Sequence, residues 1–391
     1  MPFLFFMSCL IAVNAWLTIR VRRATDLDHK GMHIAMVWIV PFMGALLTHW
    51  HLRPYERSQK TGARPASRES EEQPEEIIHA PGVLSLPFTS HLVTENGFPM
   101  PDWPLVNTWL DSIASDGARL DARLRCHRSW LLHLRTALGP HFWLHETANA
   151  FVLSSLEENV AQATARYVSS TRTRIGRLLG NLAHFPEGEK SILLVLDDED
   201  WYYNYISVFY PDQGEFAFSG GIFVGAGCPH FVVRRGDLAM IEPVIAHELT
   251  HSALAHLQLP LWIDEGIAVN TEHKLVGSSG NLHTPQEIRE KHLRFWGAAE
   301  IRQFWTGESF ARADDGNMLS YDLARTIVEQ LGKSWDAFEL FVKHAQRVDA
   351  GAASAAEHFD LDLGAYVCAL FDRPPSEDWA PRPQALAKGP A

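Results

Sequence analysis

The motif His-Glu-Leu-Thr-His at residues 247–251 constrains the fold of this 391-residue chain more than any other feature. It lies in an apolar run that predicts a helix over 238–257. Residues four apart on a helix share one face, so His247 and His251 project side by side. Glu248 points in an adjoining direction, from which its carboxylate can act beside the two imidazoles without joining them. The fold must therefore present one face of this helix to a site.

A third acidic or imidazole side chain is expected from the segment after this helix. A proline ends or redirects the chain, and a second apolar helix is predicted over 261–273, beginning Leu-Trp-Ile-Asp-Glu-Gly-Ile-Ala. A carboxylate buried on such a face is costly unless it has a partner, and a metal ion is one. Glu265 is the preferred third ligand. Asp264 is an alternative, which faces away if Trp262 and Ile263 pack inward.

Two imidazoles and one carboxylate favour zinc, whose catalytic sites use three protein ligands and keep one position open. We therefore expect His247, His251 and Glu265 to bind Zn²⁺. Zinc would polarise an attacking water and a substrate carbonyl, with Glu248 as general base and then general acid. Because the chain contains 20 histidines, the first motif alone can arise by chance. The second motif makes a three-ligand site the better interpretation.

Together, H-E-L-T-H and W-I-D-E-G-I-A resemble the gluzincin metallopeptidases, which include thermolysin and the aminopeptidase N-type enzymes. Their pattern is H-E-x-x-H, a spacer, then W-x-x-E-G-x-A with its Glu as third ligand. The spacer here, 252–264, is shorter than in the aminopeptidases and closer to that of compact bacterial gluzincin-like domains. The resemblance covers about 150–347. It implies a zinc metallopeptidase domain with a small sheet before the metal-binding helix.

The resemblance also implies roles for residues outside the two motifs. Its aminopeptidase-type members supply a tyrosine from a helix after the third ligand, and Tyr321 stands at a comparable place, although it also fits an ordinary helix tyrosine. Gly220 and Gly221, in the strand-like stretch 216–225, would let a substrate backbone bind along the strand edge. The sequence lacks the G-A-M-E-N stretch with which the aminopeptidases hold a free N-terminus. This departure favours an endopeptidase acting on peptides or proteins.

Two other functions stay open. One is a catalytically silent, zinc-bound domain that binds peptides or stabilises a membrane complex, and the other is hydrolysis of a non-peptide amide or ester. The presence of Glu248 favours catalysis, because loss of this residue would be the sign of a silent site. His256 and His273 are more typical of packing or surface histidines than of ligands.

The N-terminus predicts a membrane anchor. Two apolar runs, 3–19 and 33–50, are each about long enough to cross a bilayer, and arginines follow the first run rather than precede it. We predict an uncleaved hairpin of two transmembrane helices over 1–52, with one span plus a re-entrant segment as the alternative. Positive charges nearly balance on the two flanks. A bacterial-type inner membrane is expected, and the unpaired cysteines lean towards a cytoplasmic catalytic domain.

The rest of the chain predicts an α+β protein, with a small mixed β-sheet followed by a helical zinc-binding part. The predicted regions are a flexible linker over 53–77, an accessory helical region over 78–140, the metallopeptidase-like domain over 141–372 and a flexible tail over 373–391. Strands are predicted at 151–156, 191–197, 216–225 and 231–235, and later helices at 285–304, 318–331, 335–347 and 361–370. The net charge of −13 without a basic face excludes nucleic acid as an expected partner. The sequence does not indicate an oligomeric state.

Overall fold

The computed structural model of the protein describes residues 73–209, 221–236, 238–277 and 283–382. They belong to one compact unit. The predicted membrane hairpin, 1–52, lies outside the described residues. Within the described ranges, no helix combines the length and apolar character that crossing a bilayer requires.

The described part is α+β, as predicted, with helices and two β-sheets. The strands are β1 (Leu92–Glu95), β2 (Phe98–Pro101), β3 (Trp143–Glu146), β4 (Ala150–Ser154), β5 (Ser191–Leu196), β6 (Gly221–Val224) and β7 (His230–Arg234). The α-helices are α4 (Trp103–Asp111), α5 (Asp116–Leu138), α6 (Glu158–Leu179), α7 (Glu199–Ile206), α8 (Leu238–Leu254), α9 (Leu261–Val276), α10 (Pro285–Phe295), α11 (Ala298–Thr306), α12 (Asp315–Leu331), α13 (Trp335–His344), α14 (Ala352–Phe359) and α15 (Leu363–Leu370).

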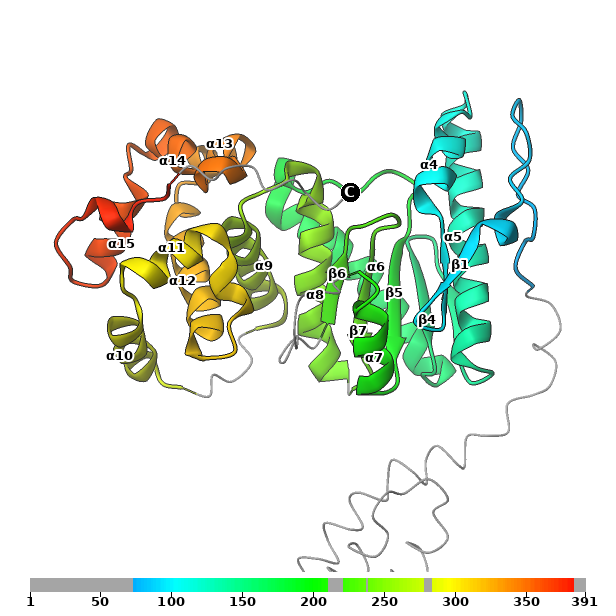
Figure 1. Ribbon diagram of the computed structural model, residues 1–391, viewed down its shortest axis with the longest axis horizontal. Coiled ribbons are helices and arrows are strands. Elements are labelled where there is room, and N and C mark those ends of the chain that lie inside the picture. Colours follow the sequence, from blue (N-terminus) through cyan, green and yellow to red (C-terminus); the bar gives the residue numbers. More distant parts are fainter. Residues whose placement is uncertain (1–72, 210–220, 237, 278–282, 383–391) are drawn as a thin grey trace, which may run out of the picture. The chain divides into compact units, whose positions relative to one another are not determined.

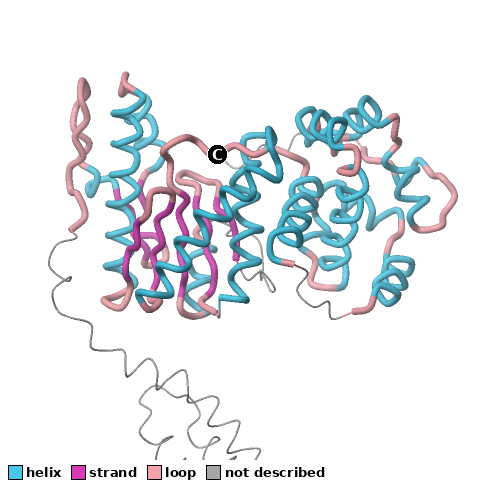
Figure 2. The backbone as a smooth tube through the Cα atoms, turned by 180° about the vertical axis from the view of Figure 1, so that it is seen from behind, coloured by secondary structure: helices cyan, strands magenta, loops and turns pink. Residues whose placement is uncertain are grey.

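The main sheet is mixed and has the strand order β3-β4-β5-β7-β6. Strands β4, β5 and β7 run parallel, whereas β3 and β6 pair antiparallel at the two edges. The parallel strands are nearly continuous apolar runs, because helices cover both of their faces (Figure 2). Strands β1 and β2 form a separate two-stranded sheet that the sequence did not predict.

Region 78–140 forms one of the layers that cover the sheet. Side chains alternate along a strand, so Leu193 and Val195 of β5 pack with α6, while Leu194 and Leu196 pack with α5 and α7. Helices α4 and α5 and the β1–β2 hairpin therefore share a hydrophobic core with the sheet. The helices predicted in this region exist, but they are integrated with the domain that follows them.

The single helix predicted over 285–304 is wrong, because the chain forms α10 and α11 instead. Gly297 lies between them in an extended conformation, and the Glu300 carboxylate accepts a hydrogen bond from its N–H at 3.1 Å. This bond caps a new helix start, which apolar periodicity alone does not reveal.

The predicted start of the flexible tail, residue 373, is wrong, because the chain stays packed on the domain beyond it. Trp379 is buried in the larger hydrophobic core, and its carbonyl accepts a hydrogen bond from the Trp305 indole at 2.8 Å. The Arg373 guanidinium lies over the Trp379 ring, 4.9 Å from its centroid. One tryptophan thus holds the described part of this proline-rich segment on the domain.

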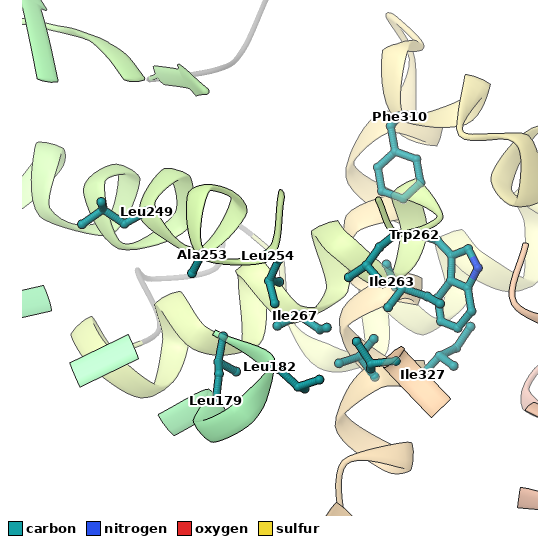
Figure 3. Packing of buried hydrophobic residues seen from close by; sticks show 14 of the residues in the cluster. Leu179, Leu182, Leu249, Ala253, Leu254, Trp262, Ile263, Ile267, Phe310 and Ile327 are labelled. Carbon is teal, nitrogen blue, oxygen red and sulfur yellow. The ribbon is translucent and has the colours of Figure 1, made fainter. Parts of the chain in front are cut away.

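Helices α8 and α9 occupy the junction between the sheet and the later helices (Figure 1). A short 3-10 turn (Ala255–Leu257) and Pro260, the N-cap of α9, reverse the chain between them. Figure 3 shows Leu254 of α8 next to Ile267 of α9, and Leu249 and Ala253 of α8 belong to the same apolar cluster. Burial of this cluster fixes the register of the two helices that carry the predicted site.

Candidate metal centre

The three predicted ligands come together between α8 and α9. His247 Nε2 lies 3.2 Å from a Glu265 oxygen, and His251 Nε2 lies 3.5 Å from the same oxygen. Two ligands about 2.05 Å from an ion at the tetrahedral angle lie about 3.3 Å apart, so these separations match a tetrahedral edge. The ligand atoms of the three residues all lie within 4.8 Å of one another. The group could hold a metal ion, which confirms the predicted convergence.

The outer nitrogens of both imidazoles face carboxylates. His247 Nδ1 lies 3.2 Å from Glu272, and His251 Nδ1 lies 3.0 Å from Asp264. An ionised carboxylate only accepts hydrogen bonds, so each Nδ1 is the donor. An imidazole that is neutral and protonated at Nδ1 would direct its Nε2 lone pair towards Glu265. In that state three electron-pair donors face one another, and a metal ion can take the place of the Nε2 protons that otherwise bond Glu265.

The electrostatics of the group also favour positive charge between the ligands. Burial alone would lower the pKa of His247, but hydrogen bonds with Glu265 and Glu272 outweigh it and raise this pKa to about 9. Burial opposes the charge of His251 as well, yet Asp264 and Glu265 raise its pKa well above the usual range. Burial alone would raise the pKa of Glu265, but the two histidines hold it far below its usual range.

Glu248 is the most enclosed carboxylate beside this group. The residue as a whole is 7% exposed, and its carboxylate accepts a hydrogen bond from the backbone N–H of Phe223 in β6. Burial raises the pKa of Glu248, while the nearby His247 and His251 act in the opposite direction. A carboxylate held in this way is suited to accept a proton from a group placed between it and the ligands.

Tyr321 of α12 reaches the same site, where its ring centroid lies 6.5 Å from that of His247 and its hydroxyl faces the negative charge of Glu265. Burial and the nearby Glu265 and Glu248 carboxylates keep the pKa of Tyr321 well above its usual value, so the hydroxyl keeps its proton. Close helix packing makes this contact feasible: a Cβ on Gly266 would lie 2.6 Å from the Ala324 carbonyl oxygen. Tyr321 therefore lies beside the ligand group, and its predicted role in chemistry stays a prediction.

The two glycines have different outcomes. Gly220 lies outside the described residues. Gly221 begins β6, the edge strand beside α8, and a Cβ there would lie 2.4 Å from the Val244 side chain and 2.9 Å from the Val232 carbonyl oxygen. Its lack of a side chain lets α8 approach the strand closely. The predicted binding of a substrate backbone along this strand stays a prediction.

The other candidates lie outside the ligand group. Asp264 contacts the outer nitrogen of His251 rather than the ligand group. Trp262 and Ile263 are fully buried, which is the condition under which Asp264 was expected to face away from the metal ion. The His256 ring packs 5.4 Å from the His184 ring, and neither His256 nor His273 belongs to the metal-ligating group.

Sequence reasoning missed Glu272. It lies seven residues after Glu265, which is two helical turns, so both carboxylates face α8. This spacing is visible in the sequence, but its meaning depends on the antiparallel register that brings Glu272 opposite His247.

No family model matches the chain, and a comparison with curated proteins finds no relative.

Proposed function

We propose that this protein is a zinc-dependent metallopeptidase that hydrolyses peptide bonds within a chain. The observation that carries the proposal is the convergence of His247 Nε2 and His251 Nε2 on Glu265, with the buried Glu248 beside them. The resemblance of the two motifs to the gluzincin metallopeptidases supports the same reaction class.

Zinc is the proposed ion because two imidazole nitrogens and one carboxylate oxygen form a donor set that it commonly takes in hydrolases. Harder cations such as calcium and magnesium prefer sites built of oxygen ligands. The matching tetrahedral separations around Glu265 further support zinc. A bound zinc ion supplies Lewis-acid chemistry, polarising the substrate carbonyl and making an attacking water more acidic.

The residues of the chain would then handle protons and charge. Glu248 accepts the proton of the attacking water and passes it to the leaving amine, and its raised pKa suits both steps. Tyr321 keeps its proton and directs a hydrogen-bond donor into the site. Such a donor stabilises the negative charge that develops on the carbonyl oxygen during attack.

Strand β6 is the proposed binding position for the substrate backbone. It forms the edge of the sheet and contacts α8, the helix that carries Glu248. Main-chain pairing at an edge strand accepts many sequences, so specificity would come from side-chain pockets. Because the Phe223 backbone already contacts Glu248, an extended peptide beside this strand would lie near the proposed general base.

The test compares wild type with Glu248→Gln, both loaded with zinc. We expect one zinc per chain in each protein, and cleavage of a mixed peptide library by wild type alone. The Glu290→Gln variant, which changes an exposed glutamate on α10, should cleave like wild type. Zinc binding without cleavage by wild type would reject the peptidase proposal and leave a silent zinc-bound domain. Absence of zinc in wild type would reject the site itself.

Attachment to a membrane through residues 1–52 belongs to the proposal. Its support is the pair of apolar runs in the sequence, each about as long as a bilayer is thick. A reporter fused after residue 76 would show on which side the catalytic domain lies. Recovery of the full-length chain in the soluble fraction would reject the anchor.

A further inference from the structure

A second pair of imidazoles lies at the surface, where α13 and α14 pack against each other. His344 Nδ1 and His358 Nε2 are 2.8 Å apart, and their rings are stacked with centroids 5.0 Å apart. His344 is exposed and His358 is partly buried, so water and ions can reach both rings. The two histidines lie outside the metal centre between α8 and α9.

The packing of the two helices fixes this pair. Helix α13 ends at His344, and His358 stands in the last turn of α14. The Ser354 hydroxyl donates a hydrogen bond to the Phe341 carbonyl at 2.8 Å, and the side chains of Phe341 and Ala355 are fully buried. Each histidine therefore projects from a helix whose position is set by buried contacts, and the pair is preorganised.

Both histidines stand at the C-terminal end of a helix. This end of a helix carries a partial negative charge that favours cations. The neighbouring cation, Lys343, pairs with Glu339 one turn earlier, at 2.6 Å. The two helix ends therefore favour a positive ion held between the imidazoles.

The separation of the two nitrogens matches a different metal geometry from that of the first site. Two imidazole nitrogens about 2.0 Å from an ion lie about 2.8 Å apart when they meet it at a right angle, and about 3.3 Å apart at the tetrahedral angle. The observed 2.8 Å fits the right angle. Tetragonal sets of nitrogen and oxygen ligands are typical of Cu²⁺, which such sites also bind more tightly than the other divalent first-row ions.

We propose that His344 and His358 form a second metal site, which binds Cu²⁺ through Nδ1 of the first ring and Nε2 of the second and joins α13 to α14. In a hydrogen bond between two neutral imidazoles, one ring donates its proton and the other accepts it. The ion takes the place of that proton, which is released to solvent, once the two accessible rings tilt towards a common point. Water molecules complete the coordination. The site is independent of the proposed zinc centre and of peptide cleavage.

The bound ion would act on the hairpin that supports the second motif. The Ala350 carbonyl, between α13 and α14, accepts a hydrogen bond from the Trp262 indole at 2.9 Å. A Cβ on Gly351 would lie 3.1 Å from the Ile263 side chain, so α9 packs closely on this connection. An ion that joins the two helices therefore reinforces the support of the helix that carries Glu265.

The experiment measures Cu²⁺ binding by the full-length, zinc-loaded protein, with equilibrium dialysis and electron paramagnetic resonance. We expect His344→Gln and His358→Gln each to remove one Cu²⁺ equivalent that wild type binds, and the zinc content to be the same in all of the proteins. The spectrum of that equivalent in wild type should show coupling to two nitrogen nuclei. The control is His184→Gln, which removes one ring of a pair that meets edge to face at 5.4 Å, and it should keep the equivalent.

Copper should also stabilise the protein against urea through the same two residues. An ion that binds only the folded state raises the unfolding midpoint as its concentration rises. Added Cu²⁺ should therefore raise the midpoint of wild type more than that of either variant. The midpoints without copper show whether the variants fold like wild type.

A double variant, His344→Gln with His358→Gln, tests whether the two rings serve one ion. It should lose no more copper than either single variant, because removing the second ligand of the same ion has no further effect. Retention of every copper equivalent by either single variant would overturn the inference, and so would the loss of two equivalents by the double variant. A wild type that binds no zinc, yet loses one copper equivalent in each single variant, would reject the proposed zinc centre and support the second site.

Discussion

We consider two alternative roles for Tyr321, which a single substitution can distinguish. Its hydroxyl contacts Glu265, and its ring centroid lies 6.5 Å from that of His247, so it could position a ligand or act on a substrate. If it stabilises developing oxyanion charge, its loss must appear in catalysis and not in metal binding. A hydroxyl that only orients Glu265 would instead affect zinc affinity.

We predict that Tyr321→Phe lowers kcat by about 10²–10³-fold, the typical effect of removing one donor from an oxyanion site, and leaves zinc affinity within about twofold of wild type. Steady-state kinetics on a cleaved peptide and chelator competition would measure the two effects. Tyr366→Phe, a matched change on α15 outside the ligand group, should leave both unchanged. A fall in zinc affinity with an unchanged kcat would assign Tyr321 a purely positioning role.

At the scale of elements, the packing of α9 on α12 determines whether Tyr321 reaches the ligands. Gly266 directly follows the third ligand, and a Cβ there would lie 2.6 Å from both the Ala324 carbonyl oxygen and the Val328 side chain. The Asn270 amide also donates a hydrogen bond to the Arg325 carbonyl across the same contact, at 2.9 Å. The glycine of the second motif therefore serves helix packing.

We predict that Gly266→Ala destabilises the protein by about 1–3 kcal/mol, because the new methyl group forces α12 away from α9. The same displacement moves Tyr321 away from Glu265 and should reduce kcat. Urea unfolding with a peptide assay would measure both changes. The control is Gly176→Ala on α6, where a Cβ meets no atom within 4 Å and helix propensity predicts a gain of about 0.5–1 kcal/mol. Equal stability changes in the two variants would contradict the packing role of Gly266.

At the scale of the whole molecule, a buried histidine outside the metal-ligating group should link stability to pH. His230 of β7 lies in the core between the sheet and α5, where Nδ1 contacts the Cys228 carbonyl at 2.7 Å and Nε2 contacts the Tyr205 hydroxyl at 2.8 Å. Nδ1 therefore donates its hydrogen, and Nε2 accepts one from Tyr205. Burial lowers the pKa of His230 to about 4 and outweighs the opposite effect of the Cys228 carbonyl.

We predict that His230 makes the free energy of unfolding decrease as the pH is lowered from about 6.5 to about 4. Above this window the side chain is neutral in both states. Within it, the unfolded chain binds a proton that the folded protein does not, at a cost of up to about 3 kcal/mol. Urea unfolding would measure the free energy of unfolding of metal-free wild type and of metal-free His230→Gln. The difference between these two free energies should become smaller as the pH is lowered. A difference that does not vary with pH would contradict this assignment.

The sequence predicted the parts of the structure that depend on local periodicity. The i, i+4 histidines, the apolar helix carrying Glu265 and the existence of strands β4, β5 and β7 all follow from spacing within a single element. By contrast, Glu272 was missed, because its contact with His247 depends on the register between two helices. The break at Gly297 and the burial of Trp379 likewise depend on one capping bond and one tertiary contact. Such features lie beyond the reach of periodic patterns.

The three proposed ligands all lie within residues 247–272, together with Glu248, Asp264 and Glu272. These acidic and imidazole groups thus come from one short segment, and the apolar cluster between α8 and α9 sets the register of its two helices. Lengthening loops elsewhere in the chain leaves that segment whole, whereas inserting one residue in α9 between Ile263 and Asp264 would turn the carboxylates by about 100° relative to the buried Trp262 and Ile263. A change of length inside α9 would thus move the carboxylates away from the histidines even though every ligand is kept.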